Sequence, residues 1–281
     1  MSKSKLNHPL PLCCTPEAFQ LMSRQAASIE SPDALVFGAA AIAMHQVENV
    51  DPATVDETIQ RYADTVRSRV RGPQTQALMA HLHDVLFDEE GFTGNEDDYY
   101  NTANSYLPEV LRTKRGLPIT LSLVYKIVAE RLGLRAWGVG LPGHFVAGVD
   151  CHGPALVDCF HGGRLLDRGD ALQLVHDTAG GEADFDESML RPVTHRHWVT
   201  RLIQNLLQIH SGAGNYTDVA AMLEFELLLW PDQLHLQRDL GLVLARIGQP
   251  RPAASWLEKY LKERPDDPQR ADLEELLGVL R

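Results

Sequence analysis

The segment from Arg115 to Asp158 constrains the fold of this chain more than any other. Its first half predicts a helix, because Pro118 suits a first helical turn, where its missing N–H would have no partner. Gly133 follows where a helix-ending glycine belongs. The second half is short, apolar and rich in glycine, and we interpret residues 146–149 and 155–158 as paired strands. A helix followed by a strand meander predicts an α+β unit.

The C-terminal region, residues 196–281, is predicted to be helical and to repeat with a period of 34 residues. The pairs that share this spacing are Leu206 and Leu240, Gly214 and Gly248, Leu223 and Leu257, and Pro231 and Pro265. This period, with a small residue at the turn and a proline after the second helix, is typical of the tetratricopeptide repeat. Two copies and a closing helix are short for a free-standing solenoid, so we expect these helices to pack on the preceding domain.

The N-terminal region carries apolar residues at helical spacing, which predicts helices that pack on the core. The predicted organisation is a flexible tail, N-terminal helices, an α+β core and repeat helices, over residues 1–16, 17–90, 91–195 and 196–281. The core opens with a loop over residues 91–104, which is rich in glycine, asparagine and aspartate and contains the pair Tyr99-Tyr100. A loop of this length often borders a binding site.

Composition excludes several classes of protein. With 44% apolar and 23% charged residues the chain predicts an ordinary globular protein, and its four cysteines are expected to be free thiols. A formal charge of -12 disfavours nucleic acid and anionic membranes as partners, because both attract clustered Lys and Arg. No apolar run approaches the roughly 20 residues that a membrane-spanning helix needs. We therefore expect a cytoplasmic protein, and we predict no cofactor.

Several unrelated short motifs occur along the chain in one order. They are Asn104-Ser105-Tyr106-Leu107, Val110-Leu111, residues 115–122, residues 131–134, residues 138–145, residues 160–163 and residues 238–242. With these motifs the chain resembles the SirB-type proteins, bacterial homologues of an invasion regulator. The resemblance implies an α+β, transglutaminase-like (papain-like) core with N-terminal helices and a C-terminal all-α tetratricopeptide-like region. It implies no established activity.

The transglutaminase-like resemblance also implies roles for individual residues. In that superfamily a cysteine opens the core helix, and a histidine and an aspartate on the following strands act as base and orienter. Here Pro118 stands in the cysteine position, His144 resembles the base and Asp158 resembles the orienter. Because proline carries no nucleophile, the resemblance implies the scaffold of a catalytic site without its cysteine. Strand alternation allows His144 and Asp158 to share one face of a small antiparallel sheet.

Other side chains of the core are candidates for a nucleophile or for metal ligands. Thr120 is the best hydroxyl, since it lies in the first helical turn, whereas Ser122 faces another side of the helix. Cys159 follows Asp158 on a strand, so we expect it to point to the opposite face and to be buried. Zinc-type ligands gather in the core at His144, Cys151, His152, Asp158, Cys159 and His161. Their spacing matches no zinc pattern, and we predict no metal site.

Three functions remain open at the level of sequence. The first is a non-catalytic protein, with regulation as one option for its role, that binds a peptide or protein partner in a cleft formed by Pro118, Asn104, Tyr100 and Gly143, beside His144 and Asp158. The second is an amide hydrolase or acyltransferase that uses Thr120 with His144 and Asp158. The third is a scaffold that acts only through its repeat helices. The sequence leaves the oligomeric state undetermined.

Overall fold

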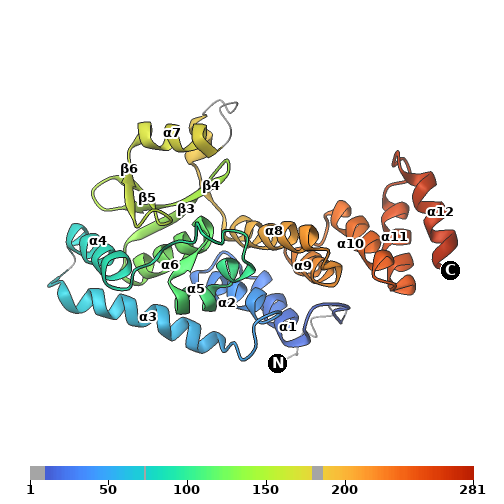
Figure 1. Cartoon of the computed structure of the whole chain (residues 1–281), viewed down its shortest axis with the longest axis horizontal. Coiled ribbons are helices and arrows are strands. Elements are labelled where there is room, and N and C mark those ends of the chain that lie inside the picture. The colour runs from blue at the N-terminus through green and yellow to red at the C-terminus, as the bar shows by residue number, and fades with distance from the viewer. Residues whose placement is uncertain (1–9, 73, 179–185) are drawn as a thin grey trace, which may run out of the picture. The chain divides into compact units, whose positions relative to one another are not determined.

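The computed structural model describes residues 10–72, 74–178 and 186–281 (Figure 1). The chain divides into two compact units. The larger unit is Ile29–Leu202, and the smaller unit joins the residues up to Ser28 with Ile203–Arg281. Helix α1 (Pro16–Ala26) therefore belongs with the C-terminal helices, which differs from the predicted grouping of residues 17–90.

The larger unit begins with helices whose starts are encoded locally. Helix α2 (Pro32–Ala43) has proline in its first turn, and the Ser31 side chain accepts a hydrogen bond from the Ala34 N–H at 3.2 Å. Helix α3 (Pro52–Arg69) begins in the same way, with Asp51 as its cap. Both caps satisfy a backbone donor that the helix itself leaves unpaired. The remaining elements before the core helix are α4 (Thr75–His83), the π-helix η1 (Asp84–Glu89), β1 (Thr93–Gly94), the 3-10 helix η2 (Thr102–Ser105), α5 (Leu107–Thr113) and β2 (Arg115–Gly116).

The core of the larger unit is an antiparallel sheet with helices on both sides. Its five strands run in the order β6-β5-β4-β3-β7. They are β3 (Arg135–Leu141), β4 (His144–Asp150), β5 (Pro154–Asp158), β6 (Arg164–Leu166) and β7 (Pro192–Val193). Helix α6 (Pro118–Arg131) and helix α7 (Arg168–Thr178) lie on opposite sides of this sheet (Figure 1). The prediction of an α+β fold is confirmed.

Helix α6 is the central element and follows its predicted signals. It begins at Pro118, and Gly133 beyond its end adopts the left-handed backbone with φ +85°. Residues 118–129 are all buried, so the helix is enclosed rather than lying on the surface. Glycines in β3 let the start of α8 (His195–Ala213) approach: a Cβ on Gly138 would lie 2.3 Å from the Trp198 ring. The indole N–H of Trp198 donates to the Ile119 carbonyl at 3.2 Å, which fixes the first turn of α6.

The smaller unit is helical, as the 34-residue period predicts. Its helices are α1, the second part of α8, α9 (Tyr216–Leu229), α10 (Leu234–Arg246), α11 (Pro250–Glu263) and α12 (Arg270–Leu280). Gly214 and Gly248, which are 34 residues apart, turn the chain between α8 and α9 and between α10 and α11, and each has φ +74°. Identical backbone geometry at both positions is what a true repeat requires.

The described part of the predicted tail is held by the smaller unit. The backbone N–H groups of Leu12, Cys13 and Cys14 donate to the carboxylate of Glu224 on α9, at 2.6, 3.0 and 2.8 Å. Helix α1 then packs against α9. A buried carboxylate thus binds three successive amides of the predicted tail. Residues 1–9 of the predicted tail lie outside the described residues.

Candidate functional site

The site centres on the carboxylate of Asp158 at the end of β5. Its Oδ1 lies 3.0 Å from His144 Nε2, and its Oδ2 lies 2.7 Å from His161 Nδ1. His144 is 6% exposed and Asp158 is 2% exposed, whereas the His161 side chain is 47% exposed. The structure thus brings together the two residues that the sequence pairs, and it adds His161, which the sequence offers only as a zinc-type ligand.

Strand register explains why His144 and Asp158 meet. His144 opens β4 directly opposite Leu141, across a tight turn in which Gly143 has φ +68°. On the next strand Val157 is opposite Ala147. Because side chains alternate along a strand, Asp158 and His144 both project from the face opposite to that of Val157 and Ala147.

A tight turn after β5 returns His161 to the same carboxylate. The Phe160 N–H donates to Asp158 Oδ1 at 3.1 Å, and the Gly163 N–H donates to the Asp158 carbonyl at 2.9 Å. Gly162 and Gly163 have φ of +64° and +77°, a backbone conformation that residues other than glycine rarely adopt. A Cβ on Gly163 would also lie 2.2 Å from the ring of Phe87 in η1. The position of His161 therefore depends on a turn with two left-handed residues, one of which, Gly163, has no room for a Cβ.

Asp158 is the ionised member of the cluster. Burial alone would raise its pKa, but hydrogen bonds and charge interactions with His144 and then His161 outweigh burial and hold the pKa below its usual 3.8. A carboxylate only accepts hydrogen bonds, so the ring nitrogens that face it carry protons. In a neutral His144 the basic nitrogen is therefore Nδ1. This is the arrangement in which an aspartate orients a histidine base.

A pocket of about 440 Å³ opens beside the two histidines. It is lined by Glu96, Tyr99, Pro118, Gly143, His144, Phe160, His161, Leu174 and Thr178. Pro118 and Gly143, which the sequence assigns to a cleft, are therefore present in its wall.

Asn104 and Tyr100 are not among the lining residues. Asn104 is buried, and its side-chain amide donates to the carbonyls of Asp98 and Tyr99 at 2.7 and 3.1 Å, so it holds the loop that carries Tyr99. Tyr100 is 71% exposed and packs edge-on against Tyr99. Tyr99 thus contributes the aromatic wall that the sequence assigns to its neighbour. The two adjacent tyrosines are indistinguishable by pattern, since loop residues have no fixed periodicity.

None of the described hydroxyls or thiols hydrogen bonds to His144. Thr120 is fully buried, does not line the pocket and has no hydrogen-bond partner for its Oγ1. Ser122 is buried too, and burial raises the pKa of the Cys159 thiol. Thr178 lines the pocket, but its hydroxyl lies 2.7 Å from the Pro142 carbonyl and 2.8 Å from the Leu174 carbonyl. Burial therefore disfavours Thr120, Ser122 and Cys159 as a nucleophile activated by His144, and the two hydrogen bonds to carbonyls disfavour Thr178.

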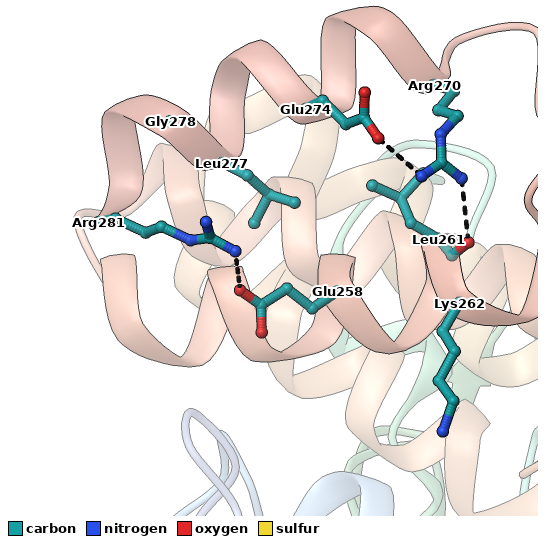
Figure 2. A pocket seen from close by; sticks show the side chains of 8 residues that line it. All are labelled: Glu258, Leu261, Lys262, Arg270, Glu274, Leu277, Gly278 and Arg281. Carbon is teal, nitrogen blue, oxygen red and sulfur yellow. Dashed lines mark hydrogen bonds and ion pairs between the residues drawn. The ribbon is translucent and has the colours of Figure 1, made fainter.

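Two further hollows lie in the smaller unit. One, of about 470 Å³, lies between α11 and α12, and Figure 2 shows its two arginines engaged by carboxylates: Arg281 with Glu258 and Arg270 with Glu274, each at 2.7 Å. Both pairs are exposed, so they add little stability. Each of the two arginines in this hollow already has a carboxylate partner. The other is an apolar groove of about 490 Å³ whose wall includes Leu12, Glu224 and Trp256. No helix in the described ranges has the length and apolar character needed to cross a membrane.

The enclosed core helix, the antiparallel sheet and the repeat helices define a transglutaminase-like protein with tetratricopeptide helices. Comparison with known families agrees: the transglutaminase-like superfamily matches residues 53–204, and the tetratricopeptide repeat matches residues 206–278. The chain is 33% identical to a UPF0162 protein of Xylella fastidiosa over 229 residues. This matched region covers 80% of this chain and 82% of that protein. The chain therefore belongs to the transglutaminase-like superfamily and, within it, to the UPF0162 proteins.

Two other relatives extend the comparison. The UPF0162 protein PA3419 of Pseudomonas aeruginosa is 28% identical over 190 residues, covering 66% of this chain and 68% of that protein. F-box only protein 21 of Mus musculus is 31% identical over 177 residues, which is 58% of this chain but 27% of that protein. No solved structure matches the chain.

Proposed function

We propose that this chain is a non-catalytic, cytoplasmic transglutaminase-like protein that binds a segment of a peptide or protein partner in the His144 pocket. The observation that carries the proposal is the position of Pro118. It begins helix α6 and lines the same pocket as His144, where an acyl-transfer enzyme would need its nucleophile. The assignment to the SirB-type proteins, and with it a regulatory role, belongs to the same proposal.

The chemistry of the wall suits a peptide. Tyr99 and Phe160 present aromatic surface, and their rings lie in contact with a centroid separation of 6.0 Å. His161 and Glu96 supply polar groups at the rim, with 3.8 Å between His161 Nε2 and Glu96 Oε1. Apolar walls with a few placed polar groups are typical of a binding pocket. Peptide side chains would pack on the rings of Tyr99 and Phe160. Backbone amides of the peptide would hydrogen bond to the imidazoles and to the Glu96 carboxylate.

The test selects peptides from a random phage-displayed library against the full chain and measures their affinity by calorimetry. We expect Tyr99→Ala and His144→Ala each to weaken the selected peptide by at least about tenfold, or about 1.4 kcal/mol. Tyr100→Ala is the matched control, because this neighbouring ring is exposed and does not line the pocket. Equal losses for Tyr99→Ala and Tyr100→Ala would contradict the proposed pocket.

The enzyme alternative is an amide hydrolase or acyltransferase that uses Thr120 with His144 and Asp158. The burial of Thr120 disfavours it. Incubation with an acyl electrophile followed by mass spectrometry discriminates the two functions. Covalent labelling at Thr120 that disappears in Thr120→Ala would replace the binding proposal with this enzyme.

A further inference from the structure

We propose that His144, Asp158 and His161 together form a site for a divalent transition-metal ion of the zinc class. One potential ligand atom from each residue lies within 4.8 Å of those of the other two. Two imidazoles and one carboxylate are a common ligand set for catalytic zinc and for non-haem iron. The proposal does not depend on peptide binding, and its test uses the metal ion alone.

The carboxylate is already oriented as a metal ligand would be. The backbone N–H groups of Phe160 and His161 donate to Asp158 Oδ1 at 3.1 and 3.4 Å. Outer hydrogen bonds of this kind fix ligating carboxylates and are costly to remove from metal sites. Asp158 is 2% exposed, so its two oxygens are shielded from water. A buried anion of this kind is stabilised further by a cation.

Each histidine can present a nitrogen lone pair without leaving its place. Metal binding requires the proton now facing Asp158 to move to the other ring nitrogen, giving His144 with Nδ1–H and His161 with Nε2–H. For His161 that second nitrogen lies 3.8 Å from the Glu96 carboxylate, which is close enough for an ion pair but longer than a hydrogen bond. A carboxylate behind a ligating histidine is the usual outer-shell arrangement.

The surroundings leave room for the ion to enter and to stay reactive. His161 is half exposed and lines the pocket of about 440 Å³, which gives access from solvent and open coordination positions. Arg201 donates a hydrogen bond to the backbone carbonyl of His144 at 3.3 Å, and its guanidinium lies over the Phe145 ring, on the other face of the sheet from the His144 side chain. Three protein ligands would leave an open coordination position, as in catalytic zinc sites.

The sequence does not reveal this site by spacing. His144, Asp158 and His161 are separated by 14 and 3 residues, which matches no linear zinc motif. They converge because two antiparallel strands and a glycine turn bring them to one place.

The test titrates Co²⁺ and then Zn²⁺ into the full chain after removal of metal with a chelator. We expect Co²⁺ to give visible absorption bands with one ion bound per chain, and Zn²⁺ to displace it. Asp158→Ala and His161→Ala should each weaken Co²⁺ binding at least about 100-fold, beyond the 10- to 100-fold typical of outer-shell changes. His176→Ala is the control, since this histidine of α7 is 68% exposed and outside the cluster.

A second readout separates loss of the site from loss of the fold. Saturating Zn²⁺ should raise the melting temperature of the wild type but not that of His161→Ala. The His161 variant keeps the bond between His144 and Asp158, so its unliganded melting curve should stay cooperative. No visible bands in the wild type, or equal Co²⁺ affinity in the wild type and His161→Ala, would overturn the metal site. Peptide binding measured with and without chelator would then still test the proposed function separately.

Discussion

At the scale of residues, burial and hydrogen bonds set the protonation states of titratable side chains. Asp158 is held anionic between two imidazoles. His83 is the opposite case. Its Nε2 lies 3.0 Å from the Tyr125 hydroxyl, and its ring packs edge-on against Phe87. Burial lowers the pKa of His83 below its usual 6.5, although Asp84 and Asp88 oppose this shift. The folded state therefore favours a neutral ring at position 83.

This depressed pKa of His83 predicts acid sensitivity. The unfolded chain binds a proton at position 83 as the pH falls below 6.5, and the folded chain binds it only at lower pH. The stability that the neutral ring contributes is thus present above pH 6.5 and is lost as the pH falls through the folded pKa. We expect His83→Gln, which keeps an acceptor for Tyr125, to flatten the decline between about pH 7 and pH 5 by at most about 1.4 kcal/mol per pH unit. Urea unfolding at several pH values measures this pH dependence of the unfolding free energy. Parallel plots of unfolding free energy against pH for the variant and the wild type would refute the prediction.

At the scale of elements, the sequence predicts what local rules encode. The start of α6 at Pro118, its end near Gly133 and the repeated turns at Gly214 and Gly248 follow from proline and glycine chemistry. The pairing of His144 with Asp158 follows from strand alternation. The arrival of His161 does not, because it depends on a turn whose glycine packs against Phe87 from a distant helix. A pattern shows that a face is buried but not which element covers it.

The repeat turns allow a test with a neighbouring control. Gly214 has φ +74° and open space around its Cβ position, so Gly214→Ala introduces backbone strain without a clash. We expect a loss of about 1–2 kcal/mol in unfolding free energy. Gly212 lies two residues earlier inside α8, also with open space, so Gly212→Ala should gain about 0.5–1 kcal/mol. Urea unfolding distinguishes them, and effects of the same sign would show that the left-handed turn is not required.

Helix α9 carries two buried glutamates with different roles. Glu224 accepts three backbone N–H bonds from residues 12–14, whereas Glu226 is bonded to the Gln204 amide at 3.1 Å and burial raises its pKa. Glu224→Gln keeps the size but loses the charge, so we expect a loss of about 1–3 kcal/mol. Glu226→Gln should cost less than about 1 kcal/mol, because its burial already favours a neutral group. Faster hydrogen exchange at the Leu12 to Cys14 amides in the Glu224 variant alone would locate the effect.

At the scale of the whole molecule, the chain is interleaved: its first helix belongs to the unit formed by its last residues. The sequence places α1 among the N-terminal helices because its amphipathic pattern, with Phe19 and Met22 buried, gives no information on the partner. The structure supplies that partner as α9. Chain order and packing order therefore differ, and deletion of one end should affect the other.

A variant that ends at Ala213 tests this arrangement, because it keeps α8 complete and removes α9 to α12. Without α9, helix α1 loses the surface on which it packs, so trypsin should cleave after Arg24 at least about tenfold faster than in the full chain. Arg67 in α3 is the control within Ile29–Leu202, and cleavage there should not change, because that unit has its own core. Mass spectrometry of the fragments reports both sites. Unchanged protection at Arg24 would mean that α1 is stable without α9, and faster cleavage at Arg67 would mean that the larger unit needs the repeat helices to fold.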